Sequence, residues 1–91
     1  MPRHTPTSDS VALALAALAA TLGNERLAQR FLSLSGIEPP ELRQRAADPA
    51  LLAALIRFLE AHEPDLLSVS EQLGLKPELL VQARRDLEGE R

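Results

Sequence analysis

The side chains in this sequence that could do chemistry are few. It has two histidines, His4 and His62, and no cysteine, tyrosine or tryptophan. The chain therefore offers no thiolate nucleophile, no cysteine-based zinc site and no disulfide. Residues 60–63 lack the ligand spacing of a zinc site, and no serine or carboxylate has an identifiable base beside it. We expect no catalytic residue, no metal site and no cofactor, and therefore a protein that is not an enzyme.

The histidines have ordinary explanations. His4 lies in a polar segment with two prolines and no neighbouring ligand, as a solvated tail residue would. His62 falls near the end of an expected helix, where its charged form would suit the helix dipole. The four glycines are scattered and form no phosphate-binding loop. A chain of 91 residues is also too short to wrap a large pocket, so no small-molecule ligand is predicted.

A second group of candidates lies near the C-terminus. Residues 66–87 have the spacing of a helix-turn-helix motif, in which the second helix enters the DNA groove. The residues that would contact nucleic acid are Gln82, Arg84 and Arg85. However, residues 64–91 carry six acidic and four basic side chains, whereas phosphate neutralisation supplies much of the affinity of such modules. Nucleic-acid binding is therefore the alternative, and a plain helical hairpin is favoured.

Another weak basic group could form if the second and third helices pack as a hairpin. The ordinary interpretation is a solvated face whose arginines pair with neighbouring glutamates, each pair contributing little. The members of this group are Arg26, Arg30, Arg43 and Arg45.

Residues 48–63 are the stretch around which the other elements are expected to pack. Asp48 is a good N-cap, and Pro49 follows at the first helical position, where a missing N–H costs nothing. Pro64 indicates the other end. The bulky apolar side chains fall on one arc of roughly 160°, and the opposite arc is mostly alanine. A helix with a bulky face and a small face can be packed on both sides, so we expect it to be central.

The composition indicates the fold class. Leucine and alanine dominate, β-branched and aromatic residues are scarce, and no segment alternates long enough for a strand. The net charge of −3 does not favour nucleic acid or an anionic membrane. We expect an all-α fold, a compact bundle of five or six short helices around residues 48–63. Residues 1–8 are expected to be a disordered tail, residues 9–88 one helical domain, and residues 89–91 a frayed end.

Residues 10–24 carry no charge, and residues 11–20 are all apolar. This run is shorter than a membrane span. A signal peptide within residues 1–20 remains an alternative, with Arg3 as its basic region. We favour a buried helix, capped by Ser8 or Asp9 and closed by Gly23. Its expected inward stripe is Val11, Leu15, Leu18 and Leu22, with Leu13 on the opposite face.

The remaining helices are expected at residues 25–35, 39–47, 65–73 and 77–87. In the first of them Leu27, Phe31 and Leu34 form the apolar side, and in the last the inward residues are Leu79, Leu80, Ala83 and Leu87. The turns at residues 36–39 and 74–77 share one pattern, a glycine, an apolar residue and then a proline. Shared turn chemistry explains this pattern better than an internal duplication.

Residues 31–43 (FLSLSGIEPPELR), residues 48–52 (DPALL) and the turn at residues 74–78 (GLKPE) resemble a family of small bacterial helical proteins catalogued only as a domain of unknown function. The likeness extends from residue 10 to residue 87. Its motifs are caps and core positions. The resemblance therefore implies a compact cytoplasmic bundle, and it carries over no functional residue.

The function favoured by the sequence is a protein-interaction or regulatory module, with a protein partner or a second copy as its ligand and no membrane association. The reason is that apolar residues remain after each helix has been given one inward face. These residues are Leu13 and Val81.

Overall fold

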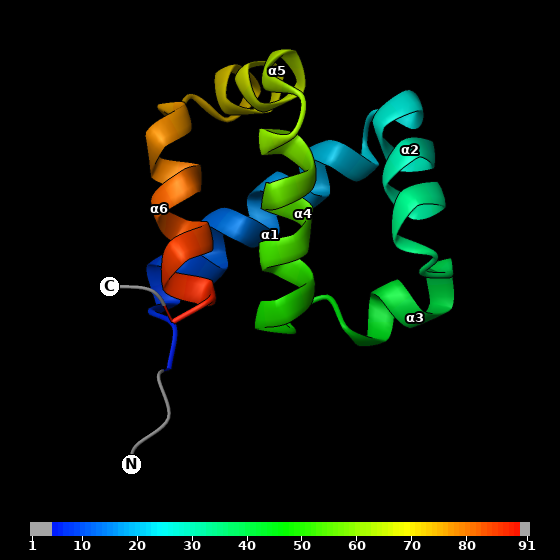
Figure 1. Ribbon diagram of the computed structural model, residues 1–91, viewed down its shortest axis with the longest axis horizontal. Helices are drawn as coiled ribbons and strands as arrows, with labels where there is room; N and C mark the ends of the chain where they lie inside the picture. Colours follow the sequence, from blue (N-terminus) through cyan, green and yellow to red (C-terminus); the bar gives the residue numbers. More distant parts are fainter. Residues whose placement is uncertain (1–4, 90–91) are drawn as a thin grey trace.

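The computed structural model describes residues 5–89, which form six helices and no strand (Figure 1). The all-α prediction is confirmed. In chain order the helices are α1 (Ser8–Leu22), α2 (Glu25–Ser35), α3 (Pro39–Gln44), α4 (Pro49–Glu60), α5 (Glu63–Leu73) and α6 (Pro77–Leu87).

Helix α4 is the apolar centre that residues 48–63 predicted. Its bulky face is buried except at Phe58, which is partly buried. Leu52, Leu55, Ile56 and Leu59 have no exposed surface. It contacts α1, α5 and α6, and α1 crosses behind it (Figure 1). The helix is shorter than predicted because Ala61 is its C-cap and His62 is already the N-cap residue of α5.

The buried face of α1 differs from the predicted stripe. Leu15 and Leu22 are 37% and 38% exposed, whereas Ala14, Ala17 and Thr21 are completely buried. The reason is that α1 contacts α2, α4, α5 and α6, and small side chains allow such close packing. The Thr21 hydroxyl is satisfied because it donates to the Ala17 carbonyl at 2.8 Å.

The N-terminus of α1 is tied to the C-terminal end of α6. Thr7, rather than Ser8 or Asp9, is the N-cap, and its hydroxyl oxygen accepts from the Ser10 N–H at 3.1 Å. The Thr7 N–H donates to Asp86 Oδ2 at 2.8 Å. The disorder expected for residues 1–4, and the fraying expected for residues 90–91, lie outside the described residues.

The two matching turns have the same local structure. Gly36 and Gly74 adopt left-handed φ values of 72° and 69° at the ends of α2 and α5, which a residue with a side chain adopts at a cost. A proline then begins the next helix in each case. The apolar residues between them, Ile37 and Leu75, are partly buried against the core. These turns place α3 below α2 and α6 beside α4 (Figure 1).

Helix α3 is the least integrated element. It has six residues, ends at Gln44 instead of near Ala47, and buries only Leu42.

Within residues 5–89, no single helix is long and apolar enough to cross a membrane. Helices α1 and α2 would meet the requirement of length and composition only together, as a pair bent by 109°.

Candidate functional site

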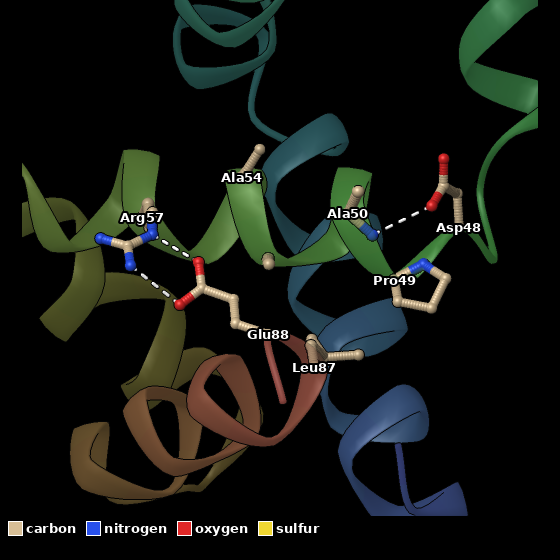
Figure 2. Close-up of a pocket in the computed structure, with 8 residues that line it drawn as sticks. Asp48, Pro49, Ala50, Ala54, Arg57, Leu87 and Glu88 are labelled. Carbon is tan, nitrogen blue, oxygen red and sulfur yellow. Dashed lines mark hydrogen bonds and ion pairs between the residues drawn. The ribbon is translucent and has the colours of Figure 1, made fainter. Parts of the chain in front are cut away.

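A hollow of about 580 Å³ lies between the start of α4 and the end of α6 (Figure 2). Its lining residues are Asp48, Pro49, Ala50, Ala53, Ala54, Arg57, Leu87 and Glu88. Each charged group in it already has a structural partner. Arg57 Nη2 donates to Glu88 Oε1 at 2.8 Å, and the Asp48 carboxylate accepts from the Ala50 N–H at 3.0 Å (Figure 2).

Asp48 also accepts from Arg45 Nη2 at 3.0 Å. The Ala50 N–H and then the Arg45 guanidinium hold the pKa of the Asp48 carboxyl below its ordinary value. A carboxylate stabilised in its charged form is a poor proton acceptor at neutral pH. The hollow in Figure 2 is therefore bordered by a helix cap and an ion pair, which explains its charged residues structurally.

The residues proposed for nucleic-acid contact are separated by the fold. The Arg84 side chain is only 10% exposed. Its guanidinium donates to Glu60 at 2.8 and 3.1 Å and to Glu88 at 2.9 Å. These carboxylates raise the pKa of Arg84 above its already high value. Gln82 and Arg85 are exposed on α6, on a side that Arg84 does not share.

Val81, Gln82 and Arg85 are brought together. With Pro77 and Glu78 they line a hollow of about 300 Å³ on α6. Glu78 adds a negative charge to the lining that contains Arg85. Val81 is partly buried there, and Leu13 is partly buried against the core from α1.

His62, Asp65 and Arg30 form a polar cluster between α2 and α5. Asp65 is buried, and its Oδ2 accepts from Arg30 Nη1 at 2.8 Å. His62 Nδ1 lies 3.8 Å from the same oxygen, and the Arg30 guanidinium lies 5.3 Å from the centre of the Phe58 ring. His62 was predicted at the end of the central helix, whereas the structure places it at the start of α5.

Within residues 5–89, no three His, Asp or Glu side chains converge as metal ligands would.

The second basic group does not converge either. Arg30 is paired with Asp65, and Arg45 with Glu41 and Asp48, as expected for arginines beside carboxylates. Arg26 and Arg43 are exposed.

An apolar groove between α2 and α4 was not foreseen from the sequence. It encloses about 260 Å³, and its lining residues are Phe31, Leu34, Ser35, Ala54, Phe58 and Ala61. The Phe31 and Phe58 rings meet edge to face, with centroids 5.4 Å apart. Leu34, predicted to face inward, is 75% exposed. It lies in the last turn of α2, near Gly36, where the chain turns toward α3 and leaves the outer surface of α2 uncovered.

The sequence contains one indication of this groove, the spacing of two leucines in α2. Helical periodicity alone does not decide which of the two is buried. Leu32 and Leu34 are two positions apart, so one helical face cannot bury both. The structure buries part of Leu32 and exposes Leu34.

Comparison with known proteins gives one finding. A family model with the description "Protein of unknown function (DUF3572)" matches residues 7–90. No curated protein and no solved structure matches the chain. Because the family model covers nearly the whole sequence, and its span includes all six helices, the chain belongs to the DUF3572 family of proteins of unknown function.

Proposed function

We propose that this protein is a non-enzymatic interaction module that pairs with a second copy of itself through the apolar groove between α2 and α4. The proposal includes the cytoplasmic location that the sequence resemblance implies. The main observation in support of the proposal is the position of Leu34, an exposed leucine that lines an apolar hollow.

The groove and Leu34 belong to the same face of the molecule. In a two-fold symmetric interface both subunits use the same patch. Residue i of the first copy then contacts residue j of the second, and residue j of the first contacts residue i of the second. Leu34 from one copy can therefore enter the hollow beside Ala54 of its partner, while the partner's Leu34 does the same in return.

The chemistry of the groove suits a leucine. Of the described residues in its lining, only Ser35 is polar. Ala54 and Ala61 are exposed small residues that leave space above the phenylalanine rings. Burying one leucine side chain contributes about 1.5–3 kcal/mol, and a symmetric pair buries two.

A stable dimer needs an interface larger than the groove alone. A stable interface buries about 800 Å² on each partner, roughly a seventh of the 5838 Å² surface of this chain. The contact must therefore extend from the groove onto the neighbouring outer surfaces of α2 and α4.

The test is sedimentation of the purified full chain from micromolar to millimolar concentration. We expect a reversible monomer–dimer equilibrium, and Leu34→Glu should shift it to monomer. Leu67→Glu on α5 is the matched control, because Leu67 is 46% exposed and lies outside the groove. Circular dichroism checks that both variants remain folded. A wild-type chain that stays monomeric throughout, or equal effects of the two variants, would refute the proposal.

A further inference from the structure

The hollow enclosed by α1, α2 and α3 has the features of a ligand site, and we propose that it binds an aliphatic monocarboxylate of the medium-chain fatty acid class. The hydrocarbon chain occupies the hollow, and the carboxylate pairs with Arg43 at its edge. This inference is independent of self-association, and it differs from the sequence-based expectation that no small molecule is bound.

The walls of the hollow are apolar. It encloses about 390 Å³, which lies at the lower end of the range of about 300–1,000 Å³ typical of small-molecule pockets. Its walls include Leu18 and Leu22 from α1, Ala28 and Leu32 from α2, and Leu42 from α3. Leu22, at 38% exposed, leaves apolar surface in contact with water that a bound hydrocarbon chain would cover.

Among residues 5–89, Arg43 is the only charged residue in this lining. Its side chain is exposed, and it forms no hydrogen bond or ion pair with any residue in the described range 5–89. Arg45, two residues further on, is instead committed to Glu41 and Asp48. An unpaired guanidinium is suited to a carboxylate, which it can bind through two parallel N–H···O bonds.

The same lining argues for a fatty acid over a peptide. A peptide C-terminus would carry amide N–H and C=O groups into the hollow, where they would lose their hydrogen bonds to water without compensation. A hydrocarbon chain has no such groups. Entry is feasible because α3, which forms the outer wall, is short and buries only Leu42.

The test uses decanoate below its micelle concentration, with the full chain carrying methyl labels on leucine. Isothermal titration should show saturable binding, and the methyl signals of Leu22, Leu32 and Leu42 should shift together. Decanol, which lacks the carboxylate, should bind at least about tenfold more weakly, the difference expected from losing one charge-assisted contact.

Arg43→Gln should weaken decanoate binding by a similar factor, about tenfold, and leave decanol unaffected. Arg26→Gln is the matched control, because Arg26 is also exposed but does not line the hollow. Ala28→Phe should block the hollow itself. Arg43 is a surface residue, so Arg43→Gln is expected to fold. Its affinity for decanoate therefore tests the proposal even if Ala28→Phe does not fold.

Three results would overturn the inference. They are the absence of saturable decanoate binding, unchanged affinity in Arg43→Gln, and methyl shifts confined to the groove between α2 and α4. Repeating the titration with Leu34→Glu separates this site from self-association, since the ligand site should be retained in that variant.

Discussion

Arg84 of α6 holds Glu60 of α4 through two hydrogen bonds, one from Nε to Oε2 at 2.8 Å and one from Nη2 to Oε1 at 3.1 Å. Glu88, the C-cap residue of α6, accepts a third from Nη1 at 2.9 Å. The guanidinium thus joins two core helices. A phosphate contact would have to compete with two carboxylates that already neutralise this cation, which weighs against the nucleic-acid alternative.

Arg84→Ala is expected to destabilise the fold by about 2 kcal/mol, because it leaves Glu60 without its cation and removes the packing of the long side chain. The matched control is the adjacent Arg85→Ala, an exposed position where a change below about 0.5 kcal/mol is expected. Urea unfolding measures both. Equal effects at the two positions would contradict the structural role of Arg84.

The cap of α4 should make stability depend on pH. The pKa of Asp48 is lowered in the folded protein relative to its ordinary value of 3.8. The stabilisation from its charged form is therefore complete above that value and is lost as the pH falls through the lower folded-state pKa. Asp48→Asn keeps a capping oxygen without the charge, so its stability difference from wild type should shrink as the pH falls below 3.8.

Asp48→Ala serves as the comparison, because it also removes the capping oxygen. It should cost about 1 kcal/mol relative to Asp48→Asn, with that difference persisting in acid. Thermal unfolding at neutral and acidic pH distinguishes the two contributions. If all three proteins showed the same acid dependence, the Asp48 carboxylate would have no role in it.

The alanine face of α1 should tolerate no enlargement. Ala17 is completely buried, so Ala17→Leu should overpack the crossing of α1 with its neighbours and destabilise by about 1–3 kcal/mol. Ala19→Leu, on the exposed side of the same helix, should change stability by less than about 0.5 kcal/mol. The opposite order in denaturant unfolding would favour the leucine stripe that periodicity predicted.

Local signals predicted the helices well. Asn24 caps α2 through its side chain, Gly36 ends it in a left-handed conformation, and Pro77 begins α6 at the predicted residue. Each of these is decided by a few adjacent residues, through backbone hydrogen bonds and allowed φ angles. They can therefore be recognised without knowing what packs against the helix.

The buried faces were harder to predict, because they depend on the neighbours of each helix. Periodicity placed Leu15 and Leu79 inside, but they are 37% and 39% exposed. Large apolar residues count most in such patterns, whereas the close crossing of α1 requires its alanines. The burial of Arg84 was missed for the same reason, since its partner Glu60 lies 24 positions away in the sequence.

Helical periodicity alone could not show that Leu34 belongs to an exposed surface. Leu34 follows the apolar period of α2 and was therefore assigned to the core. The structure exposes it, because the described part of the chain places no helix over the outer side of α2 at that turn. Residues that satisfy a helical pattern and yet remain exposed are candidates for contact with a partner.

The most direct test of self-association is a disulfide between copies. The natural sequence has no cysteine, so variants with a single cysteine cannot form a disulfide within one chain. Leu34→Cys protein is mixed with isotopically labelled Ala54→Cys protein under mild oxidation, and mass spectrometry measures the mixed disulfide. The control mixture pairs Leu67→Cys with labelled Ala54→Cys. We predict that the first pair cross-links faster and to a greater extent than the control, because symmetric docking places residue 34 of one copy beside residue 54 of the other. Equal rates for the two mixtures would contradict the proposed interface.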